Sequence, residues 1–229
     1  MSEHLVQIGA CGWQHRDWIG EFYPDDLPEE WQLGYYGNEF QVVLVPASYW
    51  QAGPESFEQW LEESDESLRM VCELPKQGST ADSISQAIQG IEMVSQRVSA
   101  VMVPIESDLT DRQKDIYKEL AKSYPLCFDL AADIGQDKRK SLLHNLAESF
   151  EGFDYGVCWH ADQRDKQVLK LGSISITRID REFEPKELRS ILESIMTQGG
   201  AERQMILLVD GQPPSQQLLT NAGIILDLL

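Results

Sequence analysis

Short apolar runs that alternate with helical segments constrain the fold of this chain more than any other feature. Most runs are continuous rather than alternating, which is typical of parallel strands covered on both faces. Eight strands alternating with helices predict an α/β fold, a closed TIM-type (β/α)8 barrel, with function at the C-terminal ends of the strands. The predicted strands are Leu5–Cys11, Gln41–Val45, Leu68–Cys72, Ala100–Ile105, Leu126–Leu130, Tyr155–Trp159, Ser173–Arg178 and Gln204–Val209.

Apolar residues at helical spacing fill most of the intervals between these runs. Residues 84–98 carry the longest such stripe, with Thr80 or Asp82 as its N-cap, and Thr110 with Gln113 has the spacing of a capping box. Residues 161–171 are polar and too short for a full crossover helix, so we expect an irregular connection after the sixth strand. A doubly wound open sheet is the alternative fold, but its Gly-rich phosphate turn is missing after the first strand.

Length and composition favour one globular domain over residues 1–229. The longest apolar runs are five or six residues, far short of the roughly 20 that span a bilayer, so we expect no membrane segment. The N-terminus lacks the pattern of a secretory signal, which predicts a cytoplasmic protein.

The four cysteines lie far apart in apolar runs, so we expect buried, reduced thiols.

The charge of the chain is strongly negative and unevenly distributed. The net charge is -19, and residues 1–75 hold 15 acidic residues against two basic ones. An acidic surface repels phosphate backbones, so we expect no nucleic-acid partner. We use the charge only for that exclusion, since an acidic excess is also common on a solvated surface.

The segment after the first strand carries a family pattern. The chain resembles the YecE-like family, also called domain of unknown function 72. The match is specific over residues 8–40, whereas beyond residue 50 only the positions of the strands correspond. The resemblance implies a TIM-type barrel and supports no particular reaction. The residues that carry it are Ile8–Trp13, Trp18, Gly20, Phe22–Pro24, Leu27–Pro28, Tyr36 and Phe40.

Departures from the family pattern concern polar positions at the strand ends. Leu44 and Pro46 stand where the family has a carboxylate and an amide, and Glu73 replaces a lysine. In the fifth strand the carboxylate persists as Asp129, but the arginine and histidine after it are alanines; in the seventh, Arg178 persists and a histidine is lost. We therefore interpret the chain as a divergent member, a possible pseudoenzyme that binds a small molecule or a protein at the C-terminal face.

The polar residues expected at the barrel mouth supply the alternative interpretation, an enzyme of hydrolase or lyase type. Its catalytic candidates are Asp129, His160 and Asp180, acting with Arg178 and with or without a divalent metal. No close ligand pair fixes a metal geometry, and the carboxylates could equally be helix caps and rim charges, so we expect neither metal nor cofactor. The complete polar set is Asp129, His160, Asp162, Arg178, Asp180 and Asp210.

Arg178 lies inside an otherwise apolar strand and needs a partner there, since an unpaired buried charge is costly. An anionic ligand and an ion pair with Asp129, Asp180 or Asp210 are equally open, and Asp210 is included among the expected ligand-binding residues. Cys158 precedes His160 by two residues, which places both on one face of a strand. That pair is a thiol-nucleophile candidate, with buried packing as the alternative.

Four aromatic residues are expected around the first two loops of the barrel mouth: Trp13, Trp18, Tyr49 and Trp50. Their rings could stack on a flat or sugar-like ligand and so form part of a binding site. The alternative is a hydrophobic plug under the loops.

Overall fold

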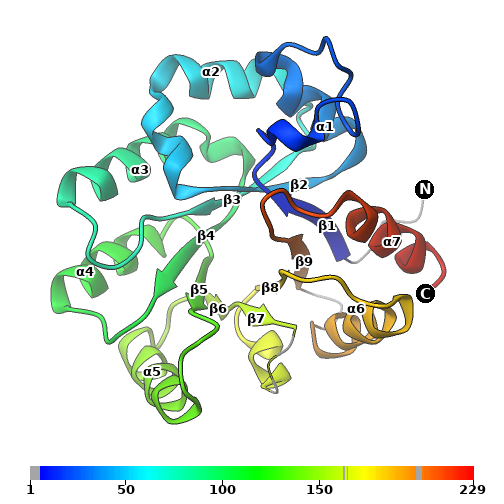
Figure 1. Cartoon of the computed structure of the whole chain (residues 1–229). Coiled ribbons are helices and arrows are strands. Elements are labelled where there is room, and N and C mark those ends of the chain that lie inside the picture. The colour runs from blue at the N-terminus through cyan, green and yellow to red at the C-terminus, as the bar shows by residue number, and fades with distance from the viewer. Residues whose placement is uncertain (1–5, 162, 164, 200–202) are drawn as a thin grey trace.

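A parallel sheet rolled into a barrel forms the centre of the computed structural model, which describes residues 6–161, 163, 165–199 and 203–229. Helices surround the barrel on its outside (Figure 1). The strand order is β6-β5-β4-β3-β2-β1-β9-β8-β7, with parallel pairing between neighbours. The predicted α/β barrel is therefore confirmed.

Each of the eight predicted runs contains a strand, with bounds that differ by a residue or two at several ends. The strands are β1 (Val6–Cys11), β2 (Val42–Val45), β3 (Arg69–Glu73), β4 (Val98–Ile105), β5 (Leu126–Leu130), β6 (Tyr155–Val157), β7 (Trp159–His160), β8 (Ile174–Ile179) and β9 (Gln204–Val209). The sixth run is divided at Cys158 into β6 and β7. Because β6 pairs with β5 and β7 pairs with β8, this one segment joins the two ends of the sheet and closes the barrel.

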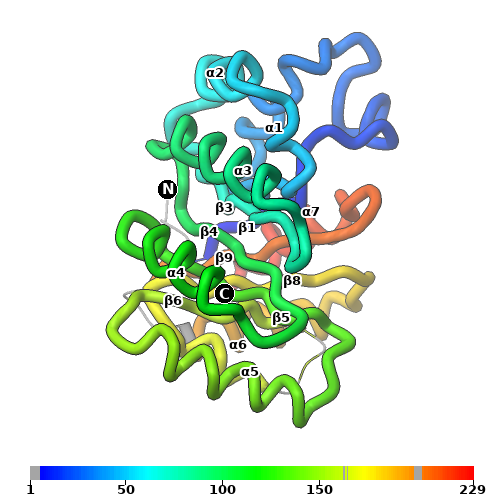
Figure 2. The backbone as a smooth tube through the Cα atoms, turned by 90° about the vertical axis from the view of Figure 1, so that its left-hand side faces the viewer, coloured from blue at the N-terminus to red at the C-terminus, as the bar shows by residue number. Residues whose placement is uncertain are grey.

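Seven α-helices lie in the described chain, two of them with the predicted caps. They are α1 (Gln32–Glu39), α2 (Pro54–Glu63), α3 (Ala81–Met93), α4 (Asp111–Leu120), α5 (Gln136–Ser149), α6 (Pro185–Gly199) and α7 (Gln216–Asp227). Thr80 caps α3 by accepting a hydrogen bond from the amide of Ser83 at 3.2 Å, and the capping box at the start of α4 is complete. Figure 2 shows the helices stacked along the outside of the barrel from a second direction.

Two of the predicted connections between strands can be compared with the structure. The predicted stripe over residues 84–98 is too long, because α3 ends at Met93 and Val98 already begins β4. A short 3-10 turn separates the two, and the side chain of Arg97 within it donates to the carbonyl of Ser64 at 3.2 Å, which fixes the turn. The irregular connection expected after the sixth strand is confirmed, since a 3-10 helix, Lys166–Lys170, is the one regular element among its described residues.

The family-like opening segment is a packed corner of the fold. The Tyr36 hydroxyl accepts from the amide of Ala10 and donates to the carbonyl of Val42, both at 2.8 Å, so it joins β1 to β2. The Tyr23 hydroxyl donates to the carbonyl of Trp13 at 2.8 Å. Gly9 allows the close approach of the strands, because a Cβ there would lie 1.8 Å from the Val42 carbonyl oxygen.

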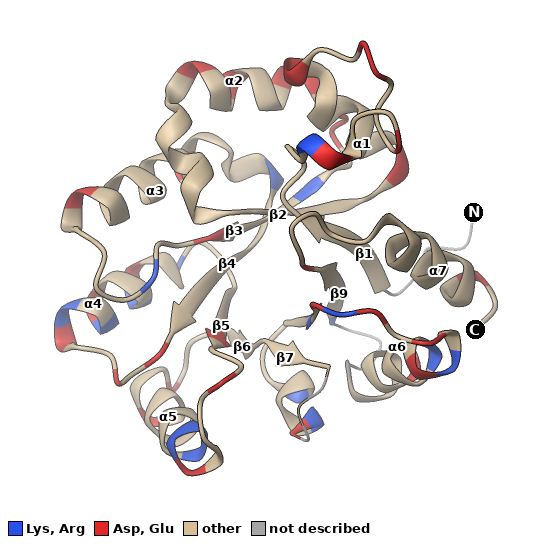
Figure 3. Ribbon diagram, in the orientation of Figure 1, with Lys and Arg blue, Asp and Glu red and all other residues tan. Residues whose placement is uncertain are grey.

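The barrel interior is a core of its own, separate from the core between the sheet and the helices. All four cysteines are buried and free, as expected. Acidic positions predominate over basic ones around α1 and α2 (Figure 3). Within the described ranges, no helix has the length and apolar character needed to cross a membrane. The interior core consists of Cys11, Val42, Leu44, Val71, Ala100, Met102, Cys127, Cys158, Ile174, Ile176, Ile206 and Leu208.

Candidate functional site

The apolar interior of the barrel ends in a polar layer at the C-terminal mouth. Side chains alternate along a strand, so the residue two positions after an interior residue also points inward. At the ends of five strands that next position is polar, and it follows an interior residue such as Val71 on β3 or Ile176 on β8. The layer consists of Glu73, Asp129, His160, Arg178 and Asp210.

Arg178 is the centre of this layer. Its Nη1 lies 2.6 Å from Asp129 Oδ2 and 3.7 Å from Glu73 Oε1, and its Nη2 donates to Asp210 Oδ2. The Arg178 side chain is 14% exposed and that of Asp129 is 8% exposed. The guanidinium is thus held by three carboxylates. Of the two alternatives for Arg178, the structure favours an ion pair within the protein over contact with an anionic ligand. Of the three partners named from the sequence, Asp129 and Asp210 take this role.

Burial and charge act against each other on these groups. Burial acts to lower the pKa of Arg178, but the acidic groups of Cys11, Asp129 and Asp210 raise it above its ordinary value. Burial acts to raise the pKa of Asp129, yet its hydrogen bond with His160 and the charge of Arg178 bring it below the ordinary value. Burial raises the pKa of Glu73, with Arg178 and the Ala47 amide offsetting only part of the effect.

Asp129 also contacts the sixth strand segment. Its Oδ1 lies 2.7 Å from His160 Nε2, while its Oδ2 is held by Arg178. One donor atom each from Asp129, Cys158 and His160 lie within 4.8 Å of one another. Burial raises the pKa of the Cys158 thiol well above its ordinary value, so the thiol is not a ready nucleophile.

An open cleft of about 470 Å³ lies above part of the polar layer; we call it the mouth cleft. Leu44 and Pro46 line it without filling it. Asp129 and His160 are not among its lining residues, so the two acid-base candidates that contact each other do not face it. The mouth cleft is lined by Cys11, Gln14, His15, Arg16, Asp17, Leu44, Pro46, Ser48, Tyr49, Glu73, Arg178, Asp210, Gly211, Gln212 and Pro213.

His15 and the neighbouring loop shape one wall of the mouth cleft. The Nε2 of His15 lies 3.1 Å from the Cys11 carbonyl oxygen, and the ring packs edge-on against Trp18 at 4.5 Å between centroids. Burial lowers the pKa of His15, with backbone contacts to Cys11 and Gly12 offsetting part of the effect. A neutral His15 donating from Nε2 therefore keeps Nδ1 as a hydrogen-bond acceptor.

A second cavity of about 400 Å³ lies beside the mouth cleft and shares Gln14, Ser48 and Tyr49 with it. Glu29 and Glu30 line this neighbouring cavity, and no Lys or Arg is among its described lining residues. The mouth cleft and the neighbouring cavity therefore form one continuous polar surface. The charged residues that the neighbouring cavity adds to it, Glu29 and Glu30, are both acidic.

The tryptophan residues of the opening loops are almost completely buried, which leaves little ring surface for the expected stacking on a ligand. Trp13, Trp18 and Trp50 are each 1% exposed. Trp13 packs edge-on against Trp60 at 5.0 Å, Trp18 donates to the Pro214 carbonyl at 3.1 Å, and Trp50 donates to the Glu73 carbonyl at 2.7 Å. The alternative of a hydrophobic plug describes them, and only Tyr49 of the four lines the mouth cleft.

The remaining candidates are divided by the structure. Asp180 is exposed directly after β8, is absent from the described ion pairs of Arg178, and so lies apart from the cluster. Asp162 lies outside the described residues.

Glu73 lines the mouth cleft, but from the sequence we identify it only as a replacement for a lysine of the family pattern. Its signal was positional, because it stands two residues after the buried Val71 at the end of an apolar run.

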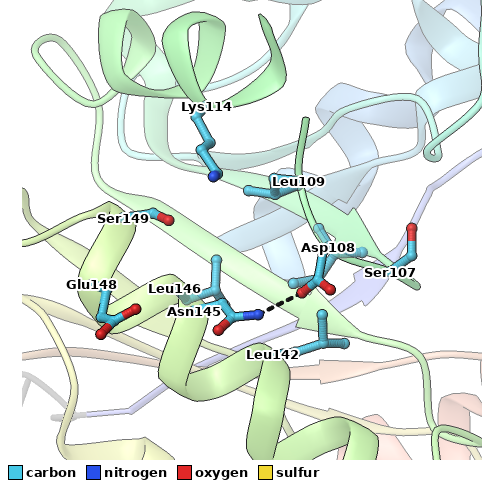
Figure 4. A pocket seen from close by; sticks show the side chains of 10 residues that line it. Ser107, Asp108, Leu109, Lys114, Leu142, Asn145, Leu146, Glu148 and Ser149 are labelled. Atoms are coloured by element: carbon cyan, nitrogen blue, oxygen red, sulfur yellow. Dashed lines mark hydrogen bonds between the residues drawn. The ribbon is translucent and has the colours of Figure 1, made fainter. Parts of the chain in front are cut away.

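A smaller cavity, about 180 Å³, lies in the outer layer between α4 and α5 (Figure 4). Asn145 Nδ2 donates across it to Asp108 Oδ1 at 2.7 Å, and the Lys114 side chain extends toward it from α4. It shares no lining residue with the mouth cleft. We therefore place the candidate site at the mouth of the barrel.

Comparison with known proteins supports the fold and leaves the function open. Residues 7–157 match the model of a family described as "Protein of unknown function DUF72". No curated protein matches the chain significantly. A crystal structure of a DUF72 family protein from Enterococcus faecalis is similar, with a TM-score of 0.68 and 11% identity over 98% of this chain and 96% of that one.

A Pseudomonas aeruginosa protein described as a candidate aldo-keto reductase is also similar in structure. Its TM-score is 0.56, with 13% identity over 96% of this chain and 89% of that one. At such identities the likeness concerns the barrel fold alone.

Proposed function

The chain belongs to the DUF72 family of proteins of unknown function, and on that premise we propose that it is a non-catalytic binding protein. Its ligand is a small, polar molecule of neutral or positive charge, bound in the mouth cleft. The observation that carries the proposal is the composition of that cleft. Arg178 is already compensated by carboxylates, whereas the paired acid-base candidates Asp129 and His160 do not line it.

The charge of the ligand is argued from the balance of the polar layer. Glu73, Asp129 and Asp210 carry three ionisable carboxylates around the single guanidinium of Arg178. The cleft itself is lined by three acidic and two basic side chains, Asp17, Glu73, Asp210, Arg16 and Arg178. An anion entering it would meet this acidic excess and the negative charge of the whole chain. A hydroxyl or an ammonium group would instead find acceptors, which supports a polyol or an amine over a phosphate.

The size and lining of the mouth cleft support a small molecule over a macromolecular partner. About 470 Å³ falls within the usual range of ligand pockets, roughly 300–1,000 Å³. Leu44, Pro46 and Pro213 give it apolar surface, while Gln14 and Ser48 add neutral hydrogen-bonding groups. A few polar groups on an apolar wall are typical of sites that orient a small ligand.

A thermal-shift screen of the full chain tests the proposal with amines, sugars and inorganic phosphate. We expect amines or sugars to raise the melting temperature and phosphate to leave it unchanged, since only a bound ligand stabilises the folded state. The Ser48→Trp variant, designed to fill the cleft, should abolish the shift in melting temperature. The control Ser190→Trp, at an exposed position of α6, should retain it. A shift with phosphate alone, or one that Ser48→Trp leaves intact, would contradict the proposal.

A second candidate function, a hydrolase- or lyase-type enzyme, is favoured by one observation. Glu73 lines the mouth cleft, and burial raises the pKa of its carboxyl above the ordinary value, which favours a role in proton transfer. Incubation of the full chain with any ligand found in the screen, followed by mass spectrometry, separates the two functions. Unchanged ligand supports binding alone. Conversion that Glu73→Gln removes while the thermal shift remains supports the enzyme.

A further inference from the structure

We propose that Asp129, Cys158 and His160 bind a divalent cation of the zinc type at the place where the barrel closes. The three residues contribute one carboxylate, one thiol and one imidazole, and their donor atoms lie within 4.8 Å of one another. Asp129 and Cys158 are buried and His160 is half-buried, so the group lies beneath the surface of the barrel mouth.

The ligand types select the class of metal. Zinc binds thiolate, imidazole and carboxylate ligands in tetrahedral sites, whereas magnesium and calcium take oxygen ligands. Zinc bond lengths of about 2.0–2.3 Å place neighbouring ligand atoms roughly 3.3–3.8 Å apart. The observed separations, from 2.7 Å between Asp129 Oδ1 and His160 Nε2 up to 4.8 Å, therefore need side-chain shifts on the order of 1 Å.

The surroundings of the three ligands support a divalent cation. Arg178 holds Asp129 Oδ2 at 2.6 Å, which leaves Oδ1 directed to the sixth strand segment. Such a partner orients a ligating carboxylate, as outer groups commonly do around metal sites. Among the described residues, Arg178 is the one Lys or Arg paired with Glu73, Asp129 and Asp210, so the acidic groups exceed the basic one. A divalent cation would offset that excess.

The position of the site gives the metal a structural role. The last paired residues of β5 and β6 are Phe128 and Val157, and β7 then pairs with β8 instead. Beyond that point the amide of Cys158 still donates to the carbonyl of Phe128 at 2.9 Å. A metal bound by Asp129 on β5 and by Cys158 and His160 would join the two sides where strand pairing ends.

This inference does not depend on the proposed ligand. None of the three residues lines the mouth cleft. Both proposals refer to the acidic groups around Arg178, but their tests are separate, because the cobalt titration measures metal binding at Cys158 and the thermal-shift screen measures occupancy of the mouth cleft.

Cobalt substitution tests the site directly in the full chain. The purified protein is stripped with a chelator, kept reduced and titrated with Co²⁺. We expect one equivalent to give a near-ultraviolet thiolate-to-cobalt absorption with the visible bands of a tetrahedral site, and Zn²⁺ to displace it. A wild-type protein without this absorption, or without stoichiometric Zn²⁺ binding, overturns the proposal even if no variant can be made.

Two variants and one matched control identify the ligands. Cys158→Ser should remove the charge-transfer absorption, and His160→Gln should weaken Zn²⁺ binding at least about tenfold, the scale of losing a metal ligand or its support. Cys72→Ser replaces another fully buried cysteine outside the group and should keep both signals. Absorption that survives Cys158→Ser would assign the metal to another thiol and overturn the site. Circular dichroism confirms that each variant is folded.

Discussion

At the barrel mouth, the pKa of each carboxyl depends on how closely that group contacts Arg178. Asp129 and Asp210 contact it closely, whereas Glu73 Oε1 lies 3.7 Å away and gains less from it. Burial then dominates for Glu73, and its pKa is raised, while the pKa of Asp129 is lowered. Burial raises the pKa of both carboxyls, and the two differ because Asp129 has the hydrogen bond with His160 and the closer contact with Arg178.

The raised pKa of Glu73 predicts a pH-dependent effect of Glu73→Gln. A carboxyl with a raised folded-state pKa contributes stability below its unfolded pKa, about 4.3, and loses it as pH rises through the folded value. The neutral amide suffers no such loss. We expect Glu73→Gln to gain stability relative to wild type as the pH rises above about 4.3, as measured by urea unfolding at a series of pH values.

The exposed Glu58→Gln variant serves as the control for Glu73→Gln, since Glu58 lies on the solvent side of α2. It measures the effect of removing an exposed carboxylate over the same pH series. A wild-type protein that gains stability relative to Glu73→Gln as the pH rises would contradict the account of Glu73.

At the scale of elements, the sequence predicts strands better than their ends. Apolar runs identify all eight strand segments because a strand buried on both faces needs no polar residue. The division at Cys158 could not be predicted, since it depends on which neighbour each half of the segment pairs with. Likewise, α1 has only Leu33 and Tyr36 as buried apolar residues, too few for a recognisable stripe.

The packing of α3 against the second loop predicts an unusual response to alanine. Alanine normally stabilises a helix by up to about 1 kcal/mol over glycine. A Cβ at Gly90, however, would lie 2.6 Å from Trp50 Cε3 and 3.1 Å from Phe57 Cε2. Since the buried indole cannot move freely, we expect Gly90→Ala to lower the free energy of unfolding by about 1–3 kcal/mol.

A matched substitution on α7 isolates that packing effect. Gly223 is also helical, and no heavy atom lies within 4 Å of the Cβ it would gain. Gly223→Ala should therefore show the ordinary gain of about 0.5–1 kcal/mol in urea unfolding. Equal effects of the two substitutions would show that Trp50 and Phe57 do not restrict α3.

At the scale of the whole molecule, the fold class follows from the order of elements, but the site does not. The alternation of strands and helices predicts a barrel and its functional end. Which side chains meet there depends on inward alternation at each strand end and on where the strand stops. Alternation joined Asp129, His160, Arg178 and Asp210. Asp180 has the same alternation as Arg178 but lies beyond the end of β8 and is exposed. The burial of the tryptophans depends on loop packing that a sequence pattern does not contain. The single domain over residues 1–229 stays a prediction.

The net charge of the chain predicts its response to salt. With 38 acidic and 19 basic residues, the folded protein carries a charge of -19, and like charges repel more strongly in the compact state than in the unfolded chain. Raising NaCl from about 0.02 M to about 0.5 M shortens the screening length from roughly 20 Å to roughly 4 Å, so distant repulsions disappear while buried pairs such as Arg178 with Asp129 persist. We expect the melting temperature at neutral pH to rise over this interval. Chloride is the appropriate anion, because sulfate would stabilise the fold by exclusion from its surface. A melting temperature that falls with NaCl would mean that exposed ion pairs, such as Arg189 with Glu193, contribute more than the acidic excess costs.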